Sequence, residues 1–157
     1  MKKLNPRWIE ALTDPLNDCP YYRLLGMKLT EIQWGRAVLE MELDGNKHLQ
    51  PFGVVHGGAV ASILDAAGFM SIFSQLDPSL GLTTVELKIN YLAPGLPGGK
   101  AVAQGRVISL GRTLGLADAE LHDHKGRLLA HATTTCMALP ELIVPGWDKL
   151  PAKFLED

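Results

Sequence analysis

The sequence predicts an α+β domain in which an antiparallel sheet of five to six strands wraps around one long central helix. Three observations support this fold class. Two strand-like segments precede the helix, four follow it, and the connections between neighbouring strands are short, as in antiparallel hairpins. The helix, expected over residues 58–76, is apolar on nearly every face, and such a helix is usually buried. A sheet curved around it would bury both.

Ahead of the central helix, the chain predicts a short helical extension and two strands. Pro6 suits the first turn of a helix, because the N–H that proline lacks would have no helical partner there. Polar and apolar residues alternate through the second strand, which is typical of a strand with one buried face. The expected elements are a helix over residues 6–12, a helical turn over 21–25, strands over 27–34 and 37–43, and a loop over 44–55.

After the central helix, four strands are expected in succession. Val85, Leu87 and Ile89 make the first of them rich in β-forming residues. A turn rich in Gly and Pro follows it, and shorter connections join the remaining strands. The tail beyond Pro140 carries two more prolines and is expected to lie on the surface. The four strands are expected over residues 83–92, 100–110, 114–122 and 127–139.

Length and composition bound the organisation of the chain. Its 157 residues, of which 46% are hydrophobic and 20% charged, fit a single domain with a core over about 27–138, an N-terminal helical extension and a C-terminal tail. The net charge of −2 and the lack of a basic cluster argue against a nucleic acid or a membrane surface as partner. No apolar run follows the basic N-terminus, so no signal peptide is expected. Cys19 and Cys136 stand apart, which favours a reducing cytoplasm over a disulfide framework.

Asp65 is the most informative residue, because it is the only charged residue in an apolar stretch over residues 57–73. An ionised carboxylate in a buried helix is costly unless partners or water satisfy it. Burial is expected to raise its pKa, whereas helix-end dipoles and hydrogen-bond donors oppose that rise. The alternative is a structural acid, for example one paired with an arginine. We favour a catalytic acid, because strongly perturbed carboxylates cluster at functional sites.

The tripeptide His56-Gly57-Gly58 stands at the start of the same helix. Unpaired backbone N–H groups at a helix start favour negative charge, so this turn is suited to an oxyanion. Gly57 is predicted to supply the N–H, although tight packing of the helix would also explain either glycine. His56 is expected to hold the turn through a ring hydrogen bond rather than to act as a general base. A carboxylate and an oxyanion-binding turn in one pocket are the parts that an acyl-group hydrolase needs.

Several motifs follow one another in a specific order. The main motif runs from Gln50 through His56-Gly57-Gly58 to Asp65, with the acid eight residues after the first glycine. A strand containing Thr84 comes next. The later motifs are Gly105-Arg106-Val107, Gly111-Arg112 and Ala130-His131-Ala132-Thr133. Together these motifs resemble the acyl-CoA thioesterases of the PaaI and 4-hydroxybenzoyl-CoA type, over about residues 27–138, and the resemblance implies the hotdog fold.

The resemblance also implies a role for each motif residue. Asp65 would act as general base on water or as nucleophile, and the Gly57 N–H would polarise the thioester carbonyl. Gln50 would orient substrate or water, and the Thr84 hydroxyl, with Thr83 as its neighbour, would support the acid. The substrate-binding residues would be His56, Gly58, Thr84 and Arg112, with Arg112 the candidate partner of a coenzyme A phosphate. Gln50 fits the 4-hydroxybenzoyl-CoA type and Asp65 the PaaI type, so the acyl group is not predicted.

Plainer alternatives exist for these residues and for the function. Gln50 would ordinarily be solvated in a loop, Thr84 is a β-former, and Arg112 is otherwise a surface charge. The histidines other than His56 show no metal-ligand spacing, so neither a metal nor another cofactor is expected. A non-catalytic acyl-CoA-binding or regulatory module would explain the fold without hydrolysis. An enoyl-CoA hydratase or dehydratase would usually carry a His-Phe-Pro motif, which this sequence lacks.

The spacing of Gly57 and Asp65 bears on assembly. Eight residues on an ideal helix separate them by about 12 Å along the axis and by roughly 80° in direction, too far for one thioester carbon to meet both. In the family that the sequence resembles, two subunits pair so that each active site takes its glycine from one chain and its acid from the other. The resemblance therefore implies that a homodimer is required for activity and that the dimers assemble into a homotetramer.

Overall fold

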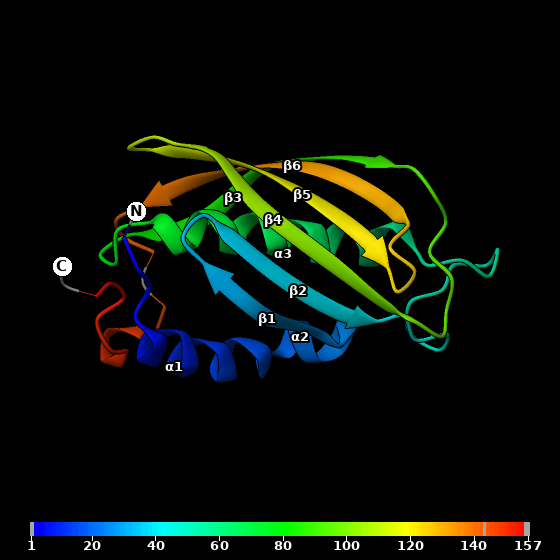
Figure 1. The fold of residues 1–157 in the computed structure, drawn as a ribbon, viewed down its shortest axis with the longest axis horizontal. Helices are drawn as coiled ribbons and strands as arrows, with labels where there is room; N and C mark the ends of the chain where they lie inside the picture. The colour runs from blue at the N-terminus through cyan, green and yellow to red at the C-terminus, as the bar shows by residue number, and fades with distance from the viewer. Residues whose placement is uncertain (1, 143, 156–157) are drawn as a thin grey trace.

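The computed structural model describes residues 2–142 and 144–155, and in it one curved sheet wraps around a single long helix (Figure 1). The six strands are antiparallel to their neighbours in the order β1-β2-β4-β5-β6-β3, so the chain crosses to the far edge of the sheet after the helix. This confirms the predicted α+β class. The strands are β1 (Met27–Gln33), β2 (Arg36–Glu42), β3 (Gly81–Tyr91), β4 (Lys100–Leu110), β5 (Leu114–Asp123) and β6 (Leu128–Leu139).

Helix α3 (Gly57–Gln75) fills the concave side of the sheet. It is long and apolar enough to cross a bilayer, but 67% of its apolar stretch is buried inside the protein, as in the core helix of a folded domain. Gly105 of β4 allows a close approach, because a Cβ there would lie 2.0 Å from the carbonyl oxygen of Ala67. The backbone of the helix therefore rests directly on the sheet, which fixes the position of the side chains that α3 carries.

The N-terminal extension forms helices α1 (Pro6–Asn17) and α2 (Pro20–Leu25). Helix α1 is longer than the predicted segment over 6–12 and continues through Pro15. Trp8 and Leu12 are buried and Leu16 packs partly against the core, so one apolar stripe at i, i+4 and i+8 holds the whole length of α1 in place. This tertiary packing outweighs the hydrogen bond that Pro15 cannot make.

The C-terminal tail lies on the surface, as its prolines predict, but contacts with the N-terminus and with α3 hold it in place. Leu4 and Phe154 form an antiparallel bridge, and the Asn5 N–H donates to the Lys153 carbonyl at 2.9 Å. The two chain ends accordingly lie at the same end of the molecule (Figure 1). The tail also contains a short 3₁₀ helix, η1 (Trp147–Lys149), which returns toward α3.

Lys153 explains why the tail is held in this position. Its side chain is 4% exposed, and its Nζ donates to the carbonyl oxygen of Leu76 at 2.7 Å and to that of Phe73. The ammonium also lies 4.5 Å from the centroid of the Phe73 ring. The last carbonyls of a helix lack helical partners and favour a cation, so the tail supplies the cap for the C-terminal end of α3.

Replacing Lys153 with Met is expected to lower the free energy of unfolding by about 2 kcal/mol, because two buried carbonyls lose their hydrogen-bond donor. Urea denaturation followed by circular dichroism measures the change. Lys149→Met is the matched control, since Lys149 lies in the same tail but is exposed. Equal unfolding free energies for the two variants would show that the Lys153 contacts do not stabilise the fold.

Candidate functional site

Asp65 is half-buried inside α3, and the Thr84 hydroxyl on β3 donates to its Oδ1 at 3.0 Å. Burial raises the pKa of Asp65, and the hydrogen bond from Thr84 partly opposes the rise. None of the ion pairs in the described part of the chain includes this carboxylate. The alternative of a structural acid neutralised by an arginine therefore has no support within one chain.

Cys136 on β6 stands directly behind Thr84, with its Sγ 3.7 Å from the threonine oxygen. Burial raises the pKa of the Cys136 thiol to about 11, so it keeps its proton. Because the single hydrogen of the Thr84 hydroxyl is donated to Asp65, the thiol is the donor in the second contact. No local pattern singles out Cys136, since only the β3–β6 pairing places it opposite Thr84.

A cavity of about 410 Å³ opens beside Asp65. It is mainly apolar, and its walls come from the N-terminal helices, α3, two strands and the C-terminal tail. Phe69 and Met70 line it, whereas Phe73 lies behind Phe69 with the ring centroids 6.2 Å apart. The lining also includes Leu16, Tyr21, Tyr22, Met27, Leu87 and Trp147.

The tyrosines and Trp147 of this cavity were not assigned to the site from the sequence. Tyr21 shares a hydrogen bond of 2.7 Å with the Ser62 hydroxyl. Burial raises the pKa of Tyr22, and the nearby Cys19 and Asp65 add to the effect, so its phenol stays neutral. Trp147 also lines the cavity. Their role depends on how the two chain ends fold back, which local sequence patterns do not reveal.

The His56-Gly57-Gly58 turn lies at the first turn of α3, as expected. His56 is the N-cap, and its Nδ1 accepts the Gly58 N–H at 2.8 Å, so the ring holds the turn. Gly57 is the first helical residue, and no acceptor for its N–H occurs among the described residues. Its carbonyl accepts a hydrogen bond of 3.1 Å from Tyr91. The Gly57 N–H is thus an unpaired donor among the described residues.

Gly57 and Asp65 do not open into the same cavity. Gln50 and Gly57 line a second cavity of about 370 Å³, together with Tyr91 and the 92–95 segment. The structure therefore brings the predicted residues together in two pairs, Gln50 with Gly57 and Asp65 with Thr84. Eight residues of continuous helix keep the two pairs about 12 Å apart.

The remaining candidates lie outside both cavities. Arg112 is exposed in the connection between β4 and β5, and Gly58 donates its N–H to His56. Within the described ranges, no three His, Cys, Asp or Glu side chains are grouped closely enough to hold a metal ion. A further hollow of about 500 Å³ lies on the outer face of the sheet, where Arg106 and Asp118 pair at 3.0 Å.

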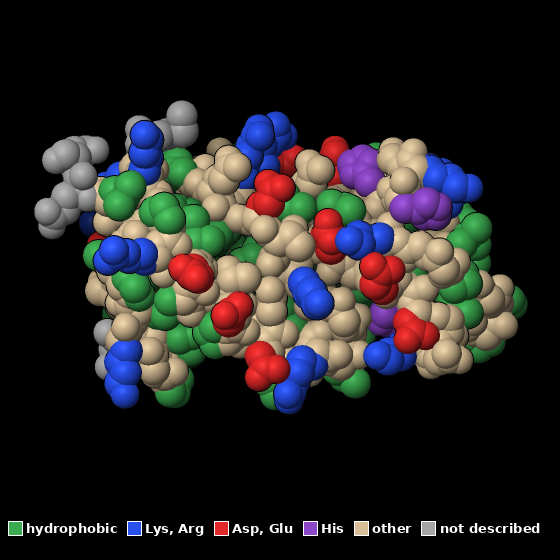
Figure 2. All heavy atoms as spheres, turned by 60° about the horizontal axis from the view of Figure 1, so that its bottom comes forward, with side chains coloured by type: hydrophobic (Ala, Val, Ile, Leu, Met, Phe, Trp, Pro, Cys, Tyr) green, Lys and Arg blue, Asp and Glu red, His purple; other side chains and the backbone are tan. Residues whose placement is uncertain are grey.

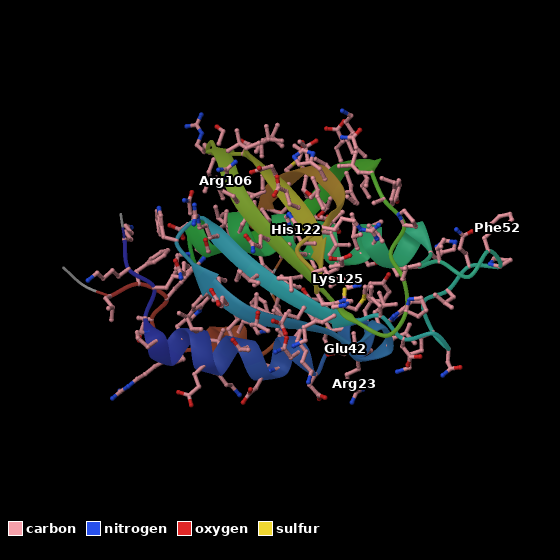
Figure 3. The ribbon with its side chains drawn as sticks, turned by 45° about the vertical axis from the view of Figure 1, so that its right-hand side comes forward. Arg23, Glu42, Phe52, Arg106, His122 and Lys125 are labelled. Carbon is pink, nitrogen blue, oxygen red and sulfur yellow. The ribbon has the colours of Figure 1, made fainter. Side chains whose placement is uncertain are left out.

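Charge is mixed over the face shown in Figure 2, where Lys and Arg side chains alternate with Asp and Glu. In Figure 3, Arg106 and His122 belong to strands of the sheet, and Phe52 stands at the tip of the loop that leads into α3. Phe52 is 87% exposed, close in sequence to Gln50 and Gly57. The loop that leads to the His56-Gly57-Gly58 turn thus carries an uncovered aromatic ring at its tip.

The chain is similar in sequence to known thioesterases. The family model of the thioesterase superfamily matches residues 52–130. The proofreading thioesterase EntH of Klebsiella pneumoniae is 31% identical over 103 residues, which are 66% of this chain and 74% of that protein. Human acyl-coenzyme A thioesterase 13 is 27% identical over 129 residues, 81% of this chain and 89% of the relative.

The fold also matches a solved structure. The PaaI protein of E. coli, from a phenylacetic acid degradation operon, superposes with a TM-score of 0.77 at 21% identity. The match covers 87% of this chain and 96% of that protein. At this level of identity the likeness shows the fold, which is the hotdog fold expected from the motifs.

Proposed function

The chain belongs to the thioesterase superfamily and is a thioester hydrolase, and from this premise we propose that it hydrolyses an acyl-CoA to a free carboxylic acid and coenzyme A. The observation that carries the proposal is the Asp65 carboxylate, which faces an apolar cavity and has no cation beside it among the described residues. A relative named as an acyl-coenzyme A thioesterase supports coenzyme A as the thiol.

In the proposed reaction, a water oxygen attacks the thioester carbon while Asp65 takes a proton from the water. The Gly57 N–H stabilises the negative charge that develops on the carbonyl oxygen. The tetrahedral intermediate then expels the coenzyme A thiolate, which receives the proton held by Asp65. In the alternative route, the Asp65 carboxylate attacks the carbon itself and the C–S bond breaks, so that coenzyme A leaves as the thiolate. Water then hydrolyses the resulting mixed anhydride, which releases the carboxylic acid and restores the Asp65 carboxylate. Gln50, beside Gly57, would orient the substrate or the water.

The two cavities support a site shared between subunits. Strand β3 is the edge of the sheet next to Asp65, and Val85, Tyr91 and Leu92 near this edge are each at least half exposed. An exposed apolar edge strand favours pairing with a second chain. We place the β3 strands of two copies against each other, so that Gly57 and Gln50 of one chain face Asp65 and Thr84 of its mate. A dimer of such dimers is the proposed tetramer.

Two smaller assignments accompany this proposal. Arg112 is exposed and free to meet a phosphate of coenzyme A bound across the dimer. Both cysteines are free thiols, which fits a reducing compartment and supports the cytoplasm as the location.

Replacing Thr84 with Val is expected to shift the acidic limb of the kcat/KM profile to higher pH. Asp65 must be ionised to act, its pKa is already raised by burial, and Thr84 is the donor that opposes the rise. Removing that donor raises the pKa further, so activity is lost at a higher pH as the solution is acidified. Measuring kcat/KM over a series of pH values gives the pH at which activity falls on the acidic side.

Thr83→Val is the matched control for Thr84→Val. Neighbouring residues on a strand face opposite sides, so Thr83 does not share the contact with Asp65. If kcat/KM falls at the same pH in both variants as the solution is acidified, the Thr84 hydroxyl does not influence the pKa of Asp65.

Steady-state hydrolysis of a panel of aryl and aliphatic acyl-CoAs, followed by release of the free thiol, tests the function. The proposal predicts thiol release that depends on enzyme concentration for at least one acyl group. Tight binding of acyl-CoAs in calorimetry with no thiol release from any of them would contradict it.

A further inference from the structure

The wall of the cavity beside Asp65 includes residues from both ends of the chain. Leu16, Tyr21 and Tyr22 come from the α1–α2 region, and Trp147 comes from η1 in the C-terminal tail. All of them lie outside the 52–130 segment that matches the family model.

The cavity has a polar end and an apolar end along α3. Ser62, bonded to the Tyr21 hydroxyl at 2.7 Å, lies one turn before Asp65. Phe69 lies about one turn after Asp65, and Phe73 about one turn further, on the same face of the helix. The apolar end is thus the end toward the C-terminus of α3.

Trp147 lies at this apolar end. Its ring centroid is 5.4 Å from that of Phe73, and the Phe73 ring stacks on Phe69. Measured along α3, Phe73 is about 12 Å beyond Asp65. The tail that brings Trp147 here is held by the pairing of Leu4 with Phe154 and by the buried Lys153.

We propose that Trp147, with Leu16 of α1, closes the acyl end of the active site and sets the longest acyl chain that the enzyme accepts. This inference rests on the proposed acyl-CoA hydrolysis. An acyl chain whose carbonyl carbon lies at Asp65 extends past Phe69 toward Trp147, because the opposite end presents hydroxyl groups. Apolar pockets discriminate by the methylenes that they accommodate or exclude. The specificity-determining residues thus come from the two ends of the chain.

The test compares kcat/KM for hexadecanoyl-CoA with that for hexanoyl-CoA in Trp147→Ala. Removing the indole opens the end of the cavity, and the ratio is expected to rise about tenfold over the wild-type ratio. Leu16→Ala is the second variant, at a lining residue that α1 contributes, and is expected to raise the ratio in the same direction. It keeps the inference testable if Trp147→Ala does not fold.

Trp34→Ala is the matched control. Trp34 contacts Phe154 of the same tail, with the ring centroids 5.5 Å apart, but lines neither the Asp65 cavity nor the Gly57 cavity. The ratio of kcat/KM for hexadecanoyl-CoA to that for hexanoyl-CoA in Trp34→Ala is expected to equal the wild-type ratio.

The outcomes separate this inference from the proposed function. An unchanged ratio in folded Trp147→Ala and Leu16→Ala, or an equal rise in Trp34→Ala, would overturn the role of Trp147 while hydrolysis itself stands. Failure of the wild type to hydrolyse any acyl-CoA would instead overturn the proposed function and this inference with it.

Discussion

Replacing Asp65 with Asn is expected to lower kcat for acyl-CoA hydrolysis by about a thousandfold, with a much smaller change in KM. The amide keeps the shape of the carboxylate and accepts the hydrogen bond from Thr84 at the same position. It can neither take a proton from water nor attack the thioester, so both proposed routes fail. Such a loss in kcat marks an interaction that acts in the transition state rather than in binding.

The stability of Asp65→Asn separates a catalytic acid from a structural one. Burial raises the pKa of Asp65, which means that the folded protein disfavours the ionised form. Removing the charge is therefore expected to leave the melting temperature at neutral pH unchanged or higher. A variant that melts well below the wild type and still turns over substrate at the wild-type rate would assign Asp65 to the fold.

Gly57→Pro is expected to lower kcat/KM by about a hundredfold, because it deletes the backbone N–H that faces the developing oxyanion. The substitution suits this position unusually well. Gly57 is the first residue of α3, where proline removes no helical hydrogen bond, and His56 has the extended conformation that a residue before proline prefers. Circular dichroism and the melting temperature are therefore expected to change little.

Gly57→Ala controls for the added bulk. A Cβ at this position would lie 3.2 Å from atoms of the Tyr91 ring, and the alanine introduces this crowding while keeping the N–H. We expect Gly57→Ala to retain most of the activity that Gly57→Pro loses. Equal losses in the two variants would attribute the effect to crowding against Tyr91 and remove the N–H from the mechanism.

The features that the sequence predicted are those that depend on local patterns. The apolar stretch around Asp65 specified α3, and alternation and turn residues located the strands to within a few residues. The family resemblance singled out Thr84, and the structure places its hydroxyl against Asp65. The α3 helix begins one residue before the predicted start, because His56 caps it at Gly57.

The features that the sequence did not predict depend on contacts between distant segments. Lys153 is 77 residues from the carbonyl of Leu76 that it caps, and no local pattern indicates such a pairing. Trp147 reaches the Asp65 cavity because the tail is held in this way, and Cys136 meets Thr84 only through the register of β3 on β6. The apolar stripe that extends α1 past Pro15 likewise needs the core against which it packs.

The most direct test of the shared active site is complementation between two inactive subunits. Asp65→Asn and Gly57→Pro chains carrying different affinity tags are co-expressed, and the mixed dimer is isolated by tandem purification. If each site takes Gly57 from one chain and Asp65 from the other, one of the two sites in the mixed dimer is intact, so about half of the wild-type kcat returns. A mixed dimer no more active than its two parents would contradict the shared site.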